Sequence, residues 1–233
     1  MKKDNSIIIG SGVIGSYLAK FLLSKRQKII VTSRKRKKAY TNYNKLNIEN
    51  KIIFEKLNFL KKDEILKLLK KYTPKNIFYF SGQSSLTKSI KLKKVTNDSN
   101  YIGAKKILEI LHKYELKTNF YKANSGYIFE PNKGLVNIKS KISKNKNPYI
   151  QSQIKAHKEV KKFRKKGVNC SSIFFLQVES PLRNNDFFIK KICTHAKLKK
   201  ILLLVILIRY EIIPGLQKLL KAFIILQKLN LEI

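Results

Sequence analysis

The stretch that decides the fold is SIIIGSGVIGSYLAKFLL, residues 6–23. Its three consecutive isoleucines, residues 7–9, predict a short buried strand, and the apolar residues in 16–23 recur at helical spacing. Between these two segments lies a GxGxxG pattern formed by Gly10, Gly12 and Gly15. A glycine turn that follows a strand and opens a helix is typical of dinucleotide-binding domains.

Each glycine of this turn has its own expected role. Gly10 permits the tight turn, Gly12 lets the backbone approach a pyrophosphate, and Gly15 allows the helix to pack close to the strand. Val13 and Ile14 complete the turn at the helix N-terminus, which attracts the phosphate charge. We therefore predict that Gly10, Gly12, Val13, Ile14 and Gly15 bind a dinucleotide cofactor. A purely structural turn remains the alternative.

Strands and helices alternate along the rest of the chain. The predicted strands are residues 7–9, 28–33, 52–57, 76–80, 119–125 and 170–178, and the predicted helices are 16–23, 62–72, 100–114 and 149–165. This order predicts an α/β fold of the Rossmann type, with a doubly wound parallel sheet covered on both faces. We assign residues 1–198 to this NAD(P)-binding domain and residues 199–233 to an apolar tail.

The composition is strongly basic, with 51 Lys and Arg against 14 Asp and Glu and a net charge of +37. The lysines are scattered over nearly every segment, and Lys, Asn and Ile share A/T-rich codons, so the base composition of the gene is a sufficient cause. Specific nucleic-acid binding is therefore not predicted. Binding to a polyanion or a membrane surface stays open as an alternative function.

Cysteine and hydropathy patterns predict a cytoplasmic protein without a metal site. Cys170 and Cys193 form neither a metal-binding spacing nor a disulfide framework. The longest apolar run, Ile201 to Ile208, falls far short of the roughly 20 residues of a membrane-spanning helix.

The end of the second predicted strand bears on the choice of cofactor. An acidic residue there binds the adenosine ribose of NAD, whereas an arginine accommodates the 2′-phosphate of NADP. The sequence places Arg34 after Thr32 and Ser33, with no acid nearby. Arg34 favours NADP, and NAD remains the alternative.

Five local patterns together resemble the extended short-chain dehydrogenase/reductase family, in particular its NAD(P)-dependent nucleotide-sugar epimerases and dehydratases. The likeness is greatest to GDP-mannose 4,6-dehydratases. The matching stretches are GSYLAKFLL (15–23), NIFYFSGQSS (76–85), NYIGAKKILEIL (100–111), PYIQSQIKA (148–156) and ESPLRNNDFFIKKI (179–192). They occur in family order and cover about residues 6–195.

The resemblance implies a role for each matching residue. Ser125 and Tyr149 correspond to the catalytic Ser/Thr and Tyr, which move a proton as a hydride moves to or from the nicotinamide. The residues that correspond to cofactor contacts are Asn58, Ser81, Gly82, Gln83 and Asn100, besides the glycine turn. Those that correspond to substrate contacts are Ser84, Glu179, Ser180 and Arg183. The implied substrate is a nucleotide-sugar, with a GDP-sugar favoured, and the implied assembly is a homodimer.

Two positions depart from the family pattern. The family places a lysine four residues after the tyrosine, where it lowers the phenol pKa, and Gln153 stands there. A cation at 4–6 Å contributes on the order of 3 kcal/mol at an effective dielectric constant near 20. Lys155 lies about 240° around the helix from Tyr149 and is a poor substitute. The second departure is Tyr127, which replaces the acid that dehydratases place two residues after the Ser/Thr.

These departures leave two functional hypotheses. The first is an epimerase or dehydratase homologue with reduced turnover, and the second is a non-catalytic NAD(P)-binding protein or degenerate paralogue. The tail from residue 199 has no counterpart in the family. We interpret it as a truncated substrate lobe, either an amphipathic helix pair or the product of a frameshift near Lys197–Lys200.

Overall fold

The computed structural model describes residues 4–34, 36–132, 134–176, 178–185 and 187–197. Its centre is a parallel six-stranded sheet in the order β3-β2-β1-β4-β5-β6. The strands are β1 (Asn5–Ile9), β2 (Lys28–Ser33), β3 (Ile53–Lys56), β4 (Asn76–Tyr79), β5 (Asn119–Ser125) and β6 (Cys170–Phe175). This order confirms the predicted doubly wound Rossmann-type sheet.

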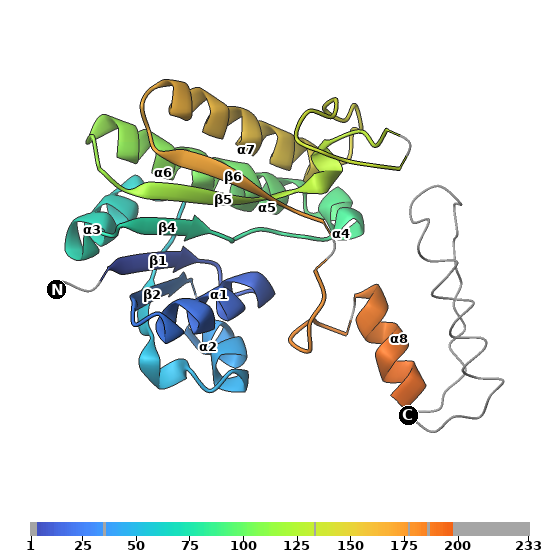
Figure 1. Cartoon of the computed structure of the whole chain (residues 1–233), viewed down its shortest axis with the longest axis horizontal. Helices are drawn as coiled ribbons and strands as arrows, with labels where there is room; N and C mark the ends of the chain where they lie inside the picture. The colour runs from blue at the N-terminus through green and yellow to red at the C-terminus, as the bar shows by residue number, and fades with distance from the viewer. Residues whose placement is uncertain (1–3, 35, 133, 177, 186, 198–233) are drawn as a thin grey trace.

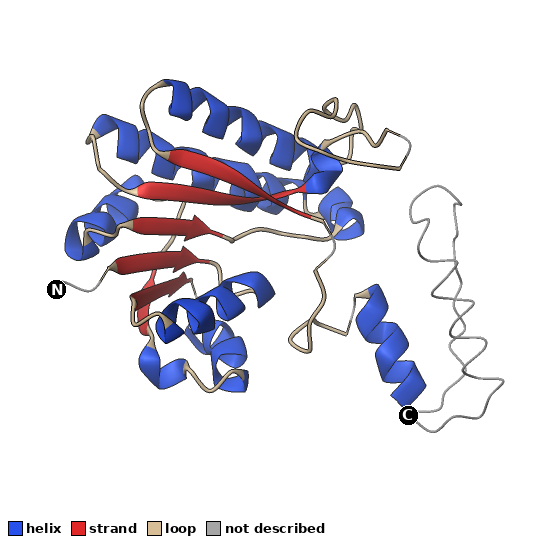
Figure 2. Ribbon diagram, in the orientation of Figure 1, coloured by secondary structure: helices blue, strands red, loops and turns tan. Residues whose placement is uncertain are grey.

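Helices lie on both sides of the sheet (Figure 2). They are α1 (Val13–Ser24), α2 (Arg36–Lys45), α3 (Lys62–Tyr72), α4 (Leu86–Lys91), α5 (Lys93–Asn97), α6 (Gly103–Lys113), α7 (Pro148–Lys165) and α8 (Phe188–Lys197). A π-helical turn, η2 (Asp98–Ile102), joins α5 to α6, and the short 3₁₀ helices are η1 (Glu49–Lys51) and η3 (Gly126–Ile128). In Figure 1, α6 and α7 run along β5 and β6, whereas α1 and α2 lie beside β1 and β2.

Successive side chains on a strand point to opposite faces of the sheet, so the strands contribute apolar residues to a hydrophobic core on each face. On β1, Ile7 and Ile9 face a large cluster with the apolar sides of α3, α6 and α7, and Ile8 faces a second cluster with α1 and α2. A parallel sheet covered on both faces needs apolar residues at every strand position, which explains the unbroken run of isoleucines in β1.

The carboxyl ends of all six strands meet at one edge of the sheet. The chain leaves β1 for β2 and β3 on one side, and then crosses to β4 on the other side of β1. Such a topological switch point opens a crevice beyond the strand ends, where α/β proteins bind ligands. The arrowheads in Figure 1 point toward the start of α7 and toward α8, so these segments lie at that edge.

Several element predictions need correction. The predicted strand 170–178 ends at Phe175, because the chain turns away from β5 after the last paired residue, Ser125. The helix predicted over 100–114 starts earlier, because a continuous helical run begins in α5 and passes through η2. The α-helix α6 itself begins only at Gly103. Helices α2, α4, α5 and α8 were not predicted at all.

The proposed tail, 199–233, lies outside the described residues. The division at residue 198 therefore stays a prediction. Within the described ranges, no helix is both long and apolar enough to cross a membrane. The same ranges hold no group of three or more His, Cys, Asp or Glu side chains placed to bind a metal ion.

Burial decides which apolar side chains stabilise this fold. Phe120 on β5 has no exposed surface, whereas Leu135 in the following loop is 74% exposed. We expect Phe120→Ala to lower the free energy of unfolding by about 3–5 kcal/mol, because it leaves a cavity in the main core. Leu135→Ala is the control and should change it by less than about 0.5 kcal/mol. Urea unfolding measures both values, and a similar cost for the two variants would contradict the burial assignment.

Candidate functional site

The glycine turn closes against the end of β4. Gly10 has a φ of +115°, and a Cβ added to it would lie 2.5 Å from the backbone nitrogen of Ser81. A Cβ on Gly15 would lie 2.2 Å from the carbonyl oxygen of Gly10. Side chains at either position would push the strand, the turn and α1 apart. The first and third glycines therefore have the structural roles that the motif predicts.

Gly12 differs from the other two glycines because it faces open space. A Cβ there would meet no atom within 4 Å, so packing does not explain the glycine. Gly12 is the N-cap of α1, with no side chain bonded to the cap and no acidic residue in the first turn. The N–H groups of that turn are thus left for an anion. A dinucleotide pyrophosphate fits this arrangement.

Asn100, in η2, ties the β4 loop to α7. Its Nδ2 donates to the carbonyl of Gln83 at 3.1 Å and to Ser152 Oγ at 3.0 Å. A Cβ on Gly82 would lie 2.2 Å from Asn100 Oδ1, so that position also requires glycine. The predicted cofactor segment Ser81–Gln83 is therefore held next to the helix that carries Tyr149. Ser84, the next residue along, is exposed.

The structure brings Ser125, Tyr149 and Gln153 together, although β5 and α7 are far apart in sequence. Asn147 caps α7 by accepting a 2.9 Å hydrogen bond from the Tyr149 backbone, with Pro148 following the cap. The side chains of Ser125 and Gln153 lie close enough to the Tyr149 phenol to affect its pKa. Burial raises the pKa of Tyr149, and the Ser125 and Gln153 side chains act to lower it.

A lysine that the sequence analysis missed lies behind Gln153. Lys122, on β5, is 1% exposed, and its Nζ donates to Gln153 Oε1 at 3.3 Å. The same ammonium donates to the carbonyl of Ala123. Burial lowers the pKa of Lys122 to about 7. A lone lysine inside the strand pattern FYKANS was the available signal.

The loop after β6 carries the predicted substrate residues. Glu179 and Arg183 lie 3.8 Å apart as an ion pair, and the Arg183 guanidinium stacks over Phe187 at 4.1 Å from the ring centre. The charge of Arg183 also acts to lower the pKa of Tyr149. Its contact with a substrate stays a prediction.

A mostly apolar cavity of about 650 Å³ opens on the α1 side of the sheet. Its walls combine α1, the ends of β4 and β6, and the loop after β6. The predicted site residues among its lining are Val13, Ile14, Glu179 and Ser180. The cavity therefore joins part of the cofactor turn to part of the substrate loop.

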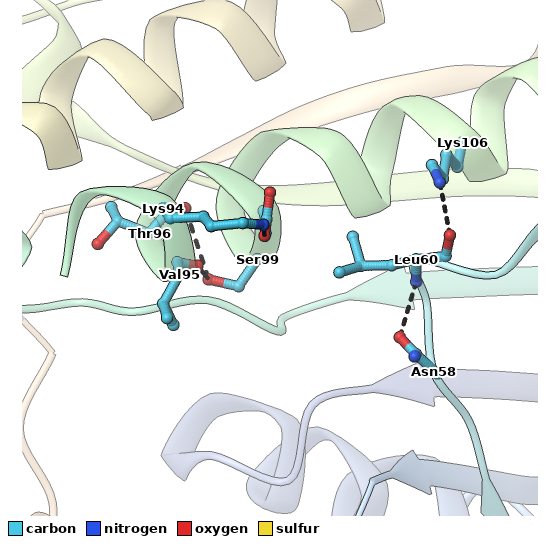
Figure 3. Close-up of polar contacts among 8 residues, drawn as sticks. Asn58, Leu60, Lys94, Val95, Thr96, Ser99 and Lys106 are labelled. Carbon is cyan, nitrogen blue, oxygen red and sulfur yellow. Dashed lines mark hydrogen bonds and ion pairs between the residues drawn. The ribbon is translucent and has the colours of Figure 1, made fainter.

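Two predicted cofactor residues lie farther along the strand ends. Arg34 is exposed in the bend after β2. Asn58 follows β3, where its side-chain oxygen accepts a 3.1 Å hydrogen bond from the Leu60 backbone, and Lys106 donates to the carbonyl of Leu60 (Figure 3). These bonds fix the Asn58 turn. No described contact joins Arg34 or Asn58 to the glycine turn.

Known structures share this fold. UDP-glucuronic acid 4-epimerase from Bacillus cereus aligns with a TM-score of 0.73 at 16% identity, covering 84% of this chain and 64% of that one. dTDP-glucose 4,6-dehydratase from Bacillus anthracis aligns with 0.72 at 19% identity, covering 84% and 62%. UDP-glucose 4-epimerase from Brucella ovis aligns with 0.65 at 16% identity, covering 75% and 52%. All three were solved with NAD, and the chain spans less than two thirds of each.

Sequence comparison gives a family. No curated protein matches the chain at a significant level. The family described as GDP-mannose 4,6 dehydratase matches residues 7–203, which is most of the 233-residue chain. The chain therefore belongs to the GDP-mannose 4,6-dehydratase family.

Proposed function

We propose that this chain binds NAD(P) at the glycine turn and uses Tyr149 and Ser125 to oxidise or reduce a sugar carbon of a nucleotide-sugar. The observation that carries the proposal is the placement of the Tyr149 phenol near Ser125, at the same sheet edge as the open turn at Gly12. Phenol and hydroxyl groups held together can share the oxygen of a reacting alcohol or ketone.

The chain's own residues would divide the work. The N-terminus of α1 holds the pyrophosphate, and Asn100 fixes the loop Ser81–Gln83 along the cofactor. The bound nicotinamide supplies hydride acceptance and donation. Ser125 holds the substrate oxygen, and Tyr149 takes its proton or returns one. Glu179, Ser180 and Arg183 border the substrate.

Redox chemistry is better supported than dehydration. Tyr127, at the position of the dehydratase acid, is 46% exposed, and its backbone N–H donates to Ser125 Oγ at 3.2 Å. A phenol is a much weaker acid than a carboxylic acid, so it is poorly suited to removing water from a sugar. The proposed reaction is therefore reversible oxidation at a sugar carbon, as in epimerisation.

The finer assignments rest on single residues or on the family. Arg34 supports NADP, whereas the neighbouring structures were solved with NAD. Family membership supports a GDP-sugar, whereas the neighbour from Thermotoga maritima was solved with UDP-glucose. A homodimer through the α6–α7 side is the assembly that the family suggests.

Gly12 allows cofactor binding to be tested apart from folding. We expect Gly12→Ala to weaken NAD(P)H binding at least tenfold in calorimetric titration, since its methyl group enters the space left for pyrophosphate. Its thermal unfolding should match the native chain. Gly15→Ala, by contrast, should lower stability by about 1–3 kcal/mol through overpacking. Native-like NAD(P)H affinity in Gly12→Ala would contradict the turn as the binding site.

Arg34 decides the cofactor preference. We expect Arg34→Gln to weaken NADPH binding about tenfold and to leave NADH binding unchanged, because only NADPH carries the 2′-phosphate. Lys20→Gln, at an exposed position on α1, is the matched loss of charge and should change neither affinity. If the native chain binds NADH more tightly than NADPH, the NADP assignment is wrong.

Tyr149 tests the chemistry. We expect Tyr149→Phe to slow cofactor reduction by nucleotide-sugars at least 100-fold while NAD(P) affinity is kept, because the phenylalanine cannot accept a proton. Absorbance of the reduced nicotinamide follows the reaction with GDP-, UDP- and dTDP-sugars. Turnover unaffected by Tyr149→Phe would overturn the proposed role. If the native chain binds cofactor but neither reduces it with any sugar nor converts any sugar to its epimer, the protein is a non-catalytic binder.

A further inference from the structure

Lys122 is an unusual residue for the interior of a sheet. It is almost fully buried between β5 and α7, although a buried ammonium is costly unless it is paired. Within the described ranges, no ion pair joins it to a carboxylate. Its contacts are the carbonyl of Ala123, the side-chain oxygen of Gln153 at 3.3 Å and the face of the Tyr79 ring at 5.6 Å. A charge retained under these conditions needs an explanation.

The contact with Lys122 orients the amide of Gln153. An ammonium has three donors and no acceptor, so the end of the amide that faces it is the oxygen. The amide NH₂ is then the end left for the Tyr149 phenol, which lies four residues earlier on the same face of α7 and whose pKa Gln153 acts to lower. An N–H donated to a phenol oxygen favours the ionised form. Lys122, Gln153 and Tyr149 thus lie in one polarised series that begins with the bond from Lys122 to Gln153.

We propose that Lys122 is a positioning residue that acts on Tyr149 through the Gln153 amide, so that β5 supplies the positive charge that α7 lacks. The proposal rests on the proposed role of Tyr149 in proton transfer. It explains why Gln153 is tolerated four residues after the tyrosine. It also explains why a buried lysine has an amide partner and no carboxylate partner, since a carboxylate would cancel the charge.

The charge on Lys122 depends on pH. Burial lowers its pKa from the ordinary 10.5 to about 7, so the ammonium is present below about pH 7 and is lost as pH rises through that value. The other groups facing this cluster are Tyr79 from β4, whose own pKa is raised by burial, and Tyr127 and Arg183, which act on Tyr149. Because burial raises the pKa of Tyr79 above its ordinary value, Tyr79 stays neutral near pH 7. The influence of Lys122 on Tyr149 should therefore be strongest on the acid side of neutrality.

The test measures the ionisation of residue 149 directly, without cofactor or substrate. A tetrafluorinated tyrosine, acidic enough to ionise on the acid side of neutrality where Lys122 still carries its charge, replaces Tyr149, and its ¹⁹F resonance is titrated with pH. We expect Lys122→Met to raise the phenol pKa by about one unit. Gln153→Leu should raise it by a similar amount. The double variant should show no further rise, because both changes interrupt the same path.

Two further variants separate charge from structure. Lys155→Met removes an exposed cation from α7 two residues from Gln153 and should leave the phenol pKa unchanged. Lys122→Gln removes the charge but keeps a hydrogen-bond donor, so it carries the test if Lys122→Met fails to fold, and it should also raise the pKa. An unchanged pKa in the folded Lys122 variants, or additive shifts in the double variant, would overturn the proposal.

This measurement is independent of turnover. A chain that oxidises no nucleotide-sugar can still show the coupling, in which case the proposed function fails and the Lys122 assignment stands. The converse outcome is that turnover requires Tyr149 while the Lys122 variants leave the phenol pKa unchanged. That result would overturn the role of Lys122 and leave the proposed function standing.

Discussion

The site depends on one steric constraint. The segment that follows β1 packs directly against the backbone of the segment that follows β4. Gly10 brings the two backbones within a distance that no Cβ permits, and Gly15 sets α1 equally close to the turn. These contacts place the first turn of α1 directly beside the loop Ser81–Gln83. Asn100 and Ser152 then connect that loop to α7. The anion site and the tyrosine are therefore parts of one packed unit.

The second half of the site is set by the packing of α7 on β5. Asn124 donates to the backbone carbonyl of Gln153 at 3.2 Å, which fixes the height of the helix along the strand. With α7 fixed in this way, Tyr149 reaches Ser125, and Gln153 comes between the tyrosine and Lys122. The same strand thus provides the hydroxyl and the buried ammonium on either side of the helix contact. Losing a lysine from α7 does not leave the region without a cation.

The chain spans less than two thirds of the length of the neighbouring structures. In the described part, the loop after β6 leads into α8 and borders the apolar cavity through Glu179 and Ser180. If the proposed function holds, this apolar wall is one face of the substrate site.

Much of this protein was determined by local sequence. The sequence pattern predicted all six strands and a parallel sheet covered by helices on both faces. It did so because β-branched and aromatic runs alternate with amphipathic segments, and hydrophobic periodicity is a local property. The glycine spacing predicted the turn, although the three positions differ: Gly15 packs against Gly10 nearby in sequence, Gly10 packs against Ser81 beyond another strand, and Gly12 faces open space. Short polar helices such as α2, α4 and α5 escaped prediction because their stability comes from packing and capping, and their sequences show little periodicity.

The contact between Lys122 and Gln153 depends on the tertiary structure. The sequence showed a glutamine where a lysine was expected, and a search along the same helix found no replacement. Lys122 lies 31 positions earlier, on a different element, and it reaches Gln153 only because β5 and α7 pack face to face. Spacing along one helix identifies neighbours on that helix alone. The position of a charge across a strand–helix interface depends on side-chain packing, which the linear pattern does not encode.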